Sequence, residues 1–363
     1  MRILQVCSVA TFGGGERHLV DLARGLRARG HDVYAAAVPG SPLRAHLSFL
    51  PEENAFALGR RNYPKNLAGL ARFVRERRIE IVHAHAARDY HLAALAVRLA
   101  RRGRLVLTRH ALFPLRRINR RLLKSAARVI AVSHAVADGL RRGGVIEPSR
   151  IAVVHNGVDL ARYARPAAAG GDSTGRPFLV GTVGHLAPIK GHDVFLRAAA
   201  LVAARRADVD FVIVGEDKSP RGGYRIALER LAGELGLGGR VTLPGWRDEV
   251  ADALSSLSLF VSAARSEPFG LSIIEAMAAG LPVVAAASEG AVEIIADGTS
   301  GRLVPVGDAE ALAGAINELL DDPSERTRLG QNALRAARQS FSLARMVADT
   351  ERIYREVLSD VPE

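Results

Sequence analysis

Charged side chains stand next to glycines in two segments of the second half of the chain. Lys190 and Gly191 occur in VGHLAPIKGHDVFLRAA, in a loop that follows a predicted strand and opens a predicted helix. A lysine charge and the amide groups of a helix N-terminus both attract anions, so this loop predicts a diphosphate site. In SEPFGLSIIEAMA, Glu267 precedes a turn at Pro268–Gly270 and Glu275 lies in the helix that follows. Two acids flanking such a turn can hold sugar hydroxyls while the amides hold phosphate oxygens, although either acid alone also fits a capped helix with surface acids.

A glycine-rich turn, TFGGGERH at residues 11–18, lies between the first predicted strand and the first predicted helix. Its three glycines let a phosphate or a sugar approach backbone N–H groups at a helix N-terminus. The segment has neither the G-x-G-x-x-G spacing with a later acid nor G-x-x-x-x-G-K-[ST], so neither a dinucleotide dehydrogenase nor a P-loop enzyme is supported. A plain tight turn between strand and helix is the alternative interpretation.

Histidines follow two of the predicted strands in the first half. His110 stands just past LVLT, where it can donate a hydrogen bond to a substrate hydroxyl or carbonyl, and a structural histidine is the alternative. We expect His83 and His85, which alternate at the end of a strand, to point to opposite faces and so not to share a metal ion. No other spacing of ligand residues indicates a metal site, and we expect a metal-independent protein.

Short β-branched runs alternate with helical patterns along the chain, which is typical of βαβ units and parallel sheets in the α/β class. In the first half we predict strands at residues 3–7, 32–38, 79–84, 105–108, 129–132 and 151–154. In the second half we predict strands at residues 178–183, 210–214, 241–243, 257–261 and 282–285, and only helices from residue 309 onward. The stretch AAAGGDSTGRP, without periodicity, predicts a linker near residue 166.

These patterns predict two doubly wound, Rossmann-like domains, residues 1–165 and 166–341, facing a central cleft at the carboxyl ends of both sheets. The last segment, residues 342–363, predicts a helix that packs back on the first domain. A length of 363 residues supports two or three domains, and 48% hydrophobic with 24% charged residues is ordinary globular composition.

The composition also limits the cellular location. Cys7 is the single cysteine, which excludes a disulfide framework and a cysteine-based metal site. The N-terminal segment lacks the pattern of a signal peptide, and no apolar run is long enough to span a membrane. We therefore expect a cytoplasmic protein.

The positive charge belongs to one half of the chain. Residues 1–164 hold 29 Lys and Arg against 11 Asp and Glu, whereas residues 165–363 hold 21 against 27. The segment FPLRRINRRLLKSAARVI at residues 113–130 has six basic residues and no acid, and its apolar residues gather on one side of a helical projection. This predicts an interfacial helix and peripheral attachment to the inner face of the cytoplasmic membrane, with a solvated basic helix as the alternative. With only 5% aromatic residues, stacking on single-stranded nucleic acid is poorly supported, so we expect no nucleic-acid partner.

Nine segments in order complete the pattern: GGGERH, TRHALF, VSHAVADGL, VVHNGVD, VGHLAPIKG, FVIVGE, LPGWRDEV, SEPFGLSIIEAMA and EGAVEIIADGTSGRLVPVGD. Together they resemble the group-one family of retaining GT-B glycosyltransferases, which includes the phosphatidylinositol mannosyltransferases, over nearly the whole chain. The resemblance implies a nucleotide-sugar donor held mainly by the second domain and a glycan or lipid-linked acceptor held mainly by the first. It implies no cofactor and no metal, and a place in lipid-linked glycan or envelope polysaccharide synthesis.

The resemblance also assigns roles to single residues. Lys190 would neutralise the donor diphosphate, Glu275 would bind the ribose hydroxyls, and Glu267 would contact the donor sugar, which His110 would also face. His110, Lys190 and Glu267 are thereby implied to be catalytic. The other residues implied to bind the donor are Gly14, Gly15, His185, Trp246, Arg247, Phe269, Gly270 and Leu271, and those implied on the acceptor side are Gly14, Glu16 and His85.

The chain departs from the family pattern at two places. The family usually has arginine where this sequence has His185, so a bidentate guanidinium contact to the diphosphate is missing. The family often has Gly-Gly where this sequence has Glu289-Gly290, ahead of the acid matched by Glu293. The resemblance therefore does not identify which donor sugar this chain prefers.

The implied reaction transfers a sugar from a nucleoside diphosphate to an acceptor hydroxyl with retention, and Lys190 with helix-terminal amides would stabilise the charge on the leaving diphosphate. A nucleotide-sugar epimerase of similar architecture is the enzymatic alternative, and it would need acid/base groups on both sides of the sugar. A basic protein that binds membranes or nucleic acid is the alternative from another class.

Overall fold

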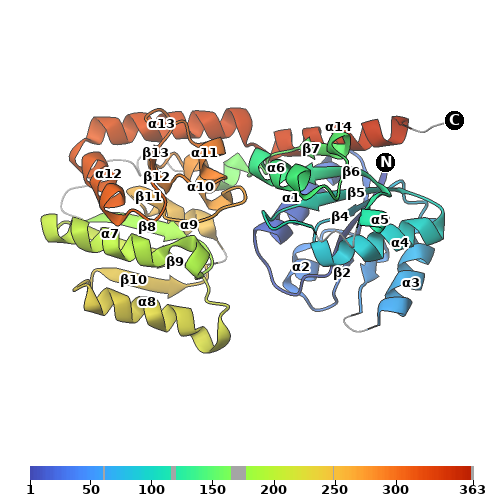
Figure 1. Cartoon of the computed structure of the whole chain (residues 1–363), viewed down its shortest axis with the longest axis horizontal. Coiled ribbons are helices and arrows are strands. Elements are labelled where there is room, and N and C mark those ends of the chain that lie inside the picture. The colour runs from blue at the N-terminus through green and yellow to red at the C-terminus, as the bar shows by residue number, and fades with distance from the viewer. Residues whose placement is uncertain (60–61, 116–119, 165–176, 248, 361–363) are drawn as a thin grey trace. The chain divides into compact units, whose positions relative to one another are not determined.

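The computed structural model describes residues 1–59, 62–115, 120–164, 177–247 and 249–360 (Figure 1). The chain divides into two compact units: unit 1 consists of Met1–Gly157 and Leu343–Glu363, and unit 2 of Val158–Ser342. The expected linker near residue 166 lies in residues 165–176, outside the described residues.

Unit 1 contains a seven-stranded sheet in the order β3-β2-β1-β4-β5-β6-β7, and each neighbouring pair is parallel. Its strands are β1 (Arg2–Cys7), β2 (Asp32–Ala37), β3 (Ala55–Ala57), β4 (Ile81–Ala84), β5 (Arg104–Arg109), β6 (Ala126–Ala131) and β7 (Ile151–Val153). The central strands β1, β4 and β5 are almost entirely buried, as expected of a parallel sheet with helices on both faces.

The helices of unit 1 include one from the end of the chain. They are α1 (Gly14–Ala28), α2 (Pro42–His46), α3 (Tyr63–Glu76), α4 (Tyr90–Ala100), α5 (Arg120–Leu123), α6 (His134–Gly143) and α14 (Leu343–Ser359). Buried side chains of α14, among them Met346, Val347 and Tyr354, belong to the same hydrophobic core as the apolar face of α1. A Cβ added to Gly25 of α1 would lie 2.4 Å from Val347 Cγ2, so the two helices pack closely because residue 25 has no side chain.

Unit 2 contains a six-stranded sheet in the order β10-β9-β8-β11-β12-β13, again with parallel neighbours. Its strands are β8 (Phe178–Val183), β9 (Val209–Val214), β10 (Val241–Gly245), β11 (Leu259–Ser262), β12 (Val283–Ala286) and β13 (Arg302–Val304). Its helices are α7 (His192–Arg205), α8 (Gly223–Glu234), α9 (Val250–Ser255), α10 (Leu271–Ala278), α11 (Ala291–Ile294), α12 (Ala309–Asp321) and α13 (Pro323–Ser340). Phe195, Phe211 and Ile316 are fully buried in its core. The prediction of two doubly wound α/β domains is confirmed.

The predicted interfacial helix at residues 113–130 is wrong. Residues 116–119 lie outside the described residues, α5 covers only Arg120–Leu123, and residues 126–131 form strand β6. Val129, expected on the apolar face of a helix, is fully buried in the sheet. The β-branched run around Val129 and Ile130 pairs with β5 and β7, and these strand contacts outweigh helical periodicity. No helix of the described residues is long and apolar enough to cross a bilayer.

The strand order places a topological switch point in each sheet. In unit 1, β1 lies between β2 and β4. The connection after β1 leads to β2 on one side, whereas the connection after β4 leads to β5 on the other side. In unit 2, β8 lies in the same way between β9 and β11. Ligands of open α/β sheets bind beyond the carboxyl ends of the strands at such points. We therefore expect ligand-binding residues in the loops after β1, β4, β8 and β11.

Candidate functional sites in the two units

The loop after β8 carries Lys190 at the end of a short 3₁₀ turn, Pro188–Lys190. Gly191 follows with φ +66°, and a Cβ there would lie 1.9 Å from the carbonyl oxygen of Ala263. Only glycine fits this close approach between the loop and the end of β11. Gly191 thus brings Lys190 to the loop after β11 and starts α7 immediately behind it.

Arg265, in the loop after β11, fastens the two loops to each other. Its backbone N–H donates to the carbonyl of Ile189 at 2.8 Å, and its guanidinium donates to the carbonyl of Pro188 at 2.8 Å. The same guanidinium makes two 2.7 Å bonds to the carboxylate of Asp193 in the first turn of α7. These hydrogen bonds, chiefly those from Arg265, hold the pKa of Asp193 below its ordinary value. The bidentate pair fixes the position of the Lys190 turn.

Glu267 forms an ion pair with Lys190, so the structure brings together two of the residues expected to be catalytic. The side chain of Glu267 is 12% exposed and that of Lys190 30% exposed, so both remain accessible to a ligand. The backbone of Glu267 is held on both sides: its N–H donates to the Glu289 carboxylate at 3.1 Å, and its carbonyl accepts from Gly290 N–H at 2.8 Å. Glu289, one of the departures from the family pattern, therefore supports the loop that carries Glu267.

The turn after Glu267 continues into α10, which begins at Leu271. Phe269 is buried, and Gly270 has φ +114°, a conformation that side chains other than glycine rarely adopt. Gly290 packs against this turn, since a Cβ there would lie 2.1 Å from the carbonyl oxygen of Phe269. Glu275 is buried in α10, and one of its carboxylate oxygens accepts a 2.8 Å hydrogen bond from the Tyr163 hydroxyl.

His185 lies in the same loop as Lys190 and stacks on Trp246, with ring centroids 5.9 Å apart and planes 15° from parallel. The ammonium of Lys218 lies 3.4 Å from Nε2 of His185. Burial first, and then the charge of Lys218, lower the pKa of His185 from its ordinary value of 6.5. A lysine therefore provides a fixed positive charge beside the position where the family usually has arginine. Trp246 and Arg247 are both exposed.

In unit 1, Gly14 and Gly15 are the first residues of α1, the helix that follows β1 after a short loop. A Cβ added to Gly15 would lie 3.7 Å from Cδ2 of His110, so the glycine turn and this histidine are neighbours. Glu16, in the first turn of α1, lies with Oε1 3.9 Å from Cys7 Sγ. The expected residues Gly14, Gly15, Glu16 and His110 thus gather at the carboxyl edge of this sheet.

Three buried or half-buried histidines, His18, His85 and His110, form a group in which one ring nitrogen of each lies within 4.8 Å of the others. Desolvation lowers the pKa of His18 to about 4 and holds those of His85 and His110 well below the ordinary value. The rings are therefore neutral near pH 7, and each offers one donor and one acceptor. Within the described part of unit 1, this group has the donor atoms that could hold a cation, and they also suit sugar hydroxyls.

The expectation that His83 and His85 point to opposite faces is wrong. Their ring centroids lie 4.1 Å apart, because residues two apart on a strand share a face. Tyr354 of α14 and Thr108 of β5 each lie 2.6 Å from a ring nitrogen of His83. Nε2 of His85 lies 2.6 Å from the side-chain oxygen of Gln5. These contacts make His83 structural and orient His85 toward the group with His18 and His110.

Sequence reasoning missed His18, Arg265 and Lys218 as contributors to these sites, and it named Glu289 only as a departure from the family pattern. His18 stood inside the quoted motif GGGERH, three residues after Gly15, so one turn of helix separates it from the glycines. Lys218 follows the strand FVIVG at the same sheet edge as Lys190, which was a usable signal. Arg265 and Glu289 act through contacts between loops that local patterns do not reveal.

Two family models match the chain, one in each half. The model described as glycosyl transferases group 1 matches residues 170–336, and that described as glycosyltransferase family 4 matches residues 12–162. Together they cover both groups of site residues.

Curated relatives and a solved structure agree with these matches. A D-inositol 3-phosphate glycosyltransferase of Streptomyces coelicolor is 33% identical over 256 residues, which is 64% of this chain and 56% of that protein. A lipopolysaccharide core biosynthesis mannosyltransferase, LpcC, of Rhizobium leguminosarum is 32% identical over 229 residues, 62% of this chain and 65% of that protein. The matches thus span less than two thirds of these relatives. The crystal structure of Anabaena Alr3699/HepE with UDP and glucose has a TM-score of 0.85 at 26% identity, covering 99% of this chain and 100% of that one. This chain belongs to the group 1 family of GT-B glycosyltransferases.

Proposed function

We propose that this protein transfers a glycosyl residue from a nucleoside diphosphate sugar to an acceptor hydroxyl, with retention of anomeric configuration. The observation that carries the proposal is the Lys190–Glu267 pair, which two interlocked loops hold at the switch point of the unit 2 sheet. A positive charge beside helix-terminal amides suits a diphosphate, and an accessible carboxylate beside it suits sugar hydroxyls.

In the proposed reaction the bond between the sugar and the diphosphate breaks while the acceptor oxygen bonds to the same carbon. The acceptor proton passes to the leaving phosphate oxygen, so charge and atoms balance without a base from the protein. Negative charge grows on the diphosphate, and Lys190 would stabilise it because an ammonium has three donors, enough for both Glu267 and a phosphate oxygen. The neutral imidazole of His110 would donate or accept one hydrogen bond with the donor sugar.

The first experiment identifies the base and the sugar of the donor. Thermal unfolding of the full chain should be measured with UDP-, GDP- and ADP-sugars, because a ligand at 100 times its Kd stabilises the folded state by about 2.7 kcal/mol. The solved relative bound to UDP and glucose supports starting with UDP-glucose. Stabilisation by one class of nucleotide sugar, and not by the corresponding free nucleobase, would support the proposal. No stabilisation by any of the nucleotide sugars would contradict it.

Product analysis separates the proposal from the epimerase alternative. Incubation with a nucleotide sugar alone should give no epimer, whereas addition of an acceptor should release the nucleoside diphosphate. Inositol phosphate and lipopolysaccharide core fragments are reasonable first acceptors, since relatives carry those names. The anomeric configuration of the product, read by NMR, tests retention.

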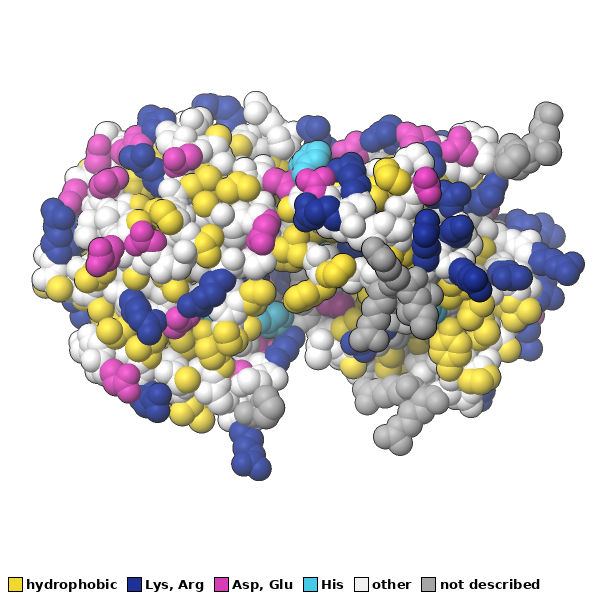
Figure 2. All heavy atoms as spheres, viewed as in Figure 1, with side chains coloured by type: hydrophobic (Ala, Val, Ile, Leu, Met, Phe, Trp, Pro, Cys, Tyr) yellow, Lys and Arg dark blue, Asp and Glu magenta, His cyan; other side chains and the backbone are white. Residues whose placement is uncertain are grey.

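We also propose that the acceptor is lipid-linked or part of an envelope polysaccharide, and that the protein attaches to the inner membrane face through unit 1. On the face of unit 1 drawn in Figure 2, Lys and Arg side chains gather closely. Each basic residue near an anionic leaflet can contribute about 1 kcal/mol. Pelleting with anionic vesicles at low salt, lost at high salt, is the expected result, and equal negligible pelleting with anionic and zwitterionic vesicles would favour a freely diffusing acceptor.

A further inference from the structure

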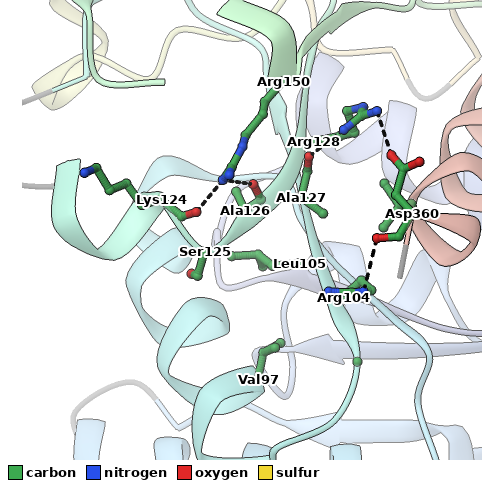
Figure 3. A pocket seen from close by; sticks show the side chains of 12 residues that line it. Val97, Arg104, Leu105, Lys124, Ser125, Ala126, Ala127, Arg128, Arg150 and Asp360 are labelled. Atoms are coloured by element: carbon green, nitrogen blue, oxygen red, sulfur yellow. Dashed lines mark hydrogen bonds and ion pairs between the residues drawn. The ribbon is translucent and has the colours of Figure 1, made fainter. Parts of the chain in front are cut away.

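A second basic site lies in unit 1, at the opposite sheet edge from Gly14 and His110. It is a pocket of about 420 Å³ at the amino ends of β5 and β6. The residues that line it are Val97, Gly103, Arg104, Leu105, Lys124, Ser125, Ala126, Ala127, Arg128, Arg150, Val357 and Asp360 (Figure 3). Its size falls within the roughly 300–1,000 Å³ usual for small-molecule sites.

The lining carries four basic side chains, Arg104, Lys124, Arg128 and Arg150, and one acidic side chain, Asp360. In Figure 3 the Lys124 side chain points away from the three arginines, so Lys124 adds charge at the rim of the pocket. Cations that line one concavity repel one another, and a pocket concentrates the resulting potential. An anion inside it would relieve that repulsion. The pocket belongs to the basic half of the chain but is a defined cavity within it.

Backbone contacts hold the arginines in place. Arg150 donates from Nη1 to the carbonyl of Ala126 at 3.2 Å and also to that of Lys124. Arg128 donates from Nη1 to the carbonyl of Ala127 at 3.1 Å. A guanidinium has five N–H donors, so these contacts orient each group and leave donors for a ligand. The side chains are therefore arranged in advance, which lowers the cost of binding.

Asp360, just beyond α14, is the acid that a ligand would displace. Its carboxylate accepts a 3.0 Å bond from Nη2 of Arg128, and its carbonyl accepts a 3.4 Å bond from Nη2 of Arg104. The Asp360 side chain is 59% exposed, so the ion pair is screened by water and easily exchanged. A carboxylate already paired with Arg128, on a residue whose backbone carbonyl is bound by Arg104, shows which chemistry the pocket accepts.

We propose that this pocket binds a phosphate-bearing anion, separately from the nucleotide-sugar site of unit 2. Phosphate oxygens match the forked donors of guanidinium groups better than a single carboxylate does, and they carry more charge. Val97, Leu105 and Val357 line the rest of the pocket, which leaves room for an apolar portion beside the phosphate. A soluble phosphate ester and a phospholipid headgroup share this chemistry.

Calorimetric titration of the full chain with inorganic pyrophosphate tests the proposal. Lys190→Ala separates the two sites, because pyrophosphate binding in the unit 1 pocket should survive it. On that background, Arg104→Ala or Arg150→Ala should raise the Kd about tenfold or more, the usual effect of losing a charged hydrogen bond. Asp360→Asn should lower the Kd, because it removes the competing carboxylate.

Two further variants guard against general effects of charge or folding. Arg98→Ala removes the same charge from an exposed position on α4 and should leave the Kd unchanged. Lys124→Glu alters an exposed side chain in the pocket without touching the carbonyl contacts of Arg150, and it should weaken binding while the thermal midpoint stays constant. Loss of all pyrophosphate binding in Lys190→Ala, or equal weakening in Arg98→Ala and the pocket variants, would overturn the proposal.

Vesicle sedimentation identifies the source of the phosphate. Phosphatidylcholine vesicles with and without phosphatidic acid should be compared for the wild type, Lys124→Glu and the control Arg98→Glu. Pelleting that requires phosphatidic acid and is lost only in Lys124→Glu assigns the pocket to a lipid headgroup. Pyrophosphate binding sensitive to the pocket variants, without such pelleting, assigns it to a soluble phosphate ester. Absence of both rules out the site.

Discussion

Lys190 is a positive charge that the unit 2 loops hold at their common edge. The turn that carries Lys190 is fixed by the close packing of Gly191 and by the hydrogen bonds of Arg265. Glu267 forms an ion pair with the Lys190 ammonium. We expect Lys190→Ala to lower kcat by about 100- to 1,000-fold, equivalent to about 2.7–4 kcal/mol, because a stabilising contact to the leaving group is lost. Transfer from a nucleotide sugar is the measurement.

The control for this variant is Lys65→Ala, which removes the same charge from an exposed position of α3 in unit 1. It should keep full turnover, and both variants should unfold near the wild-type temperature. Turnover of Lys190→Ala close to that of Lys65→Ala would remove Lys190 from the donor site.

His185 allows a test by pH. Burial and then the charge of Lys218 lower the pKa of His185 from 6.5. The imidazole is therefore neutral near pH 7 and becomes charged only at a pH below 6.5. If it contacts the diphosphate, donor affinity should be constant above neutrality and rise in acid. His185→Arg, charged at every pH, should bind the donor more tightly at pH 7.5 and show no such rise.

The titration should use the intact nucleotide sugar, since the terminal phosphate of a free nucleoside diphosphate itself titrates near pH 6. Lys218→Ala is the companion variant. It removes a charge that lowers the pKa of His185, so the rise in affinity should move to higher pH. An affinity that is flat from pH 5 to 8 in wild type and variant alike would show that His185 does not touch the donor.

At the scale of elements, packing between two loops shapes the donor turn. Gly290 has helical backbone angles that any residue can adopt, yet its missing side chain allows the carbonyl of Phe269 to approach. Gly290→Ala should therefore push the Glu267–Leu271 turn aside, costing about 1–3 kcal/mol of stability as overpacking usually does. Nucleotide-sugar affinity and the unfolding midpoint should both fall.

Gly314→Ala is the matched control for Gly290→Ala. Gly314 is exposed in the middle of α12, and nothing lies within 4 Å of an added Cβ. Alanine there should raise stability by about 0.5–1 kcal/mol through helix propensity and leave donor affinity alone. If Gly290→Ala behaves like Gly314→Ala, the contact with Phe269 does not control the turn.

The local sequence pattern was enough to predict where the loops lie along the chain, but not which loops are neighbours in the fold. Strand–loop–helix alternation put Lys190 after β8 and Glu267 after β11, and only the strand order β8-β11 makes those loops neighbours. The loop-holding contacts of Arg265 and Glu289 were not predicted because their partners lie in other loops, a relation that periodicity does not encode. The strands β3 and β13 were not predicted either, since each has three residues and too little pattern to stand out.

The segment at residues 113–130 shows the opposite error, in which a pattern was extended too far. Val129 and Ile130 are neighbours in β6 and both are buried, as in a strand of a parallel sheet that is covered on both faces. A helical projection over the whole segment hid this strand. Two of the segment's basic residues, Lys124 and Arg128, instead line a pocket at the strand ends together with Arg150 from outside the segment.

At the scale of the whole molecule, Glu351 ties the end of the chain to the start. Its buried carboxylate pairs with Arg29 at the C-terminal end of α1, accepts a 3.0 Å bond from Nε of Arg355, and lies 3.2 Å from Nε2 of His31. Burial alone would raise its pKa, but the hydrogen bonds from Arg355 and Arg29 outweigh burial and lower it to about 2. The helix α14 is thus fastened to the rest of unit 1 by an ionised group.

A folded-state pKa of about 2 against an ordinary 4.5 means that Glu351 stabilises unit 1 fully above pH 4.5 and less as the pH falls toward 2. The lowered pKa of His31, caused first by burial and then by the charge of the N-terminus, acts in the same direction below pH 6.5. We expect Glu351→Gln to unfold at a lower temperature than wild type at pH 7, with the difference shrinking between pH 5 and pH 3. Glu356→Gln, which breaks an exposed pair with Arg352 on the same helix, should differ little from wild type at any pH. Calorimetric scans across this range decide the matter, since a gap for Glu351→Gln that stays constant with pH would show that packing, not the carboxylate charge, holds α14 in place.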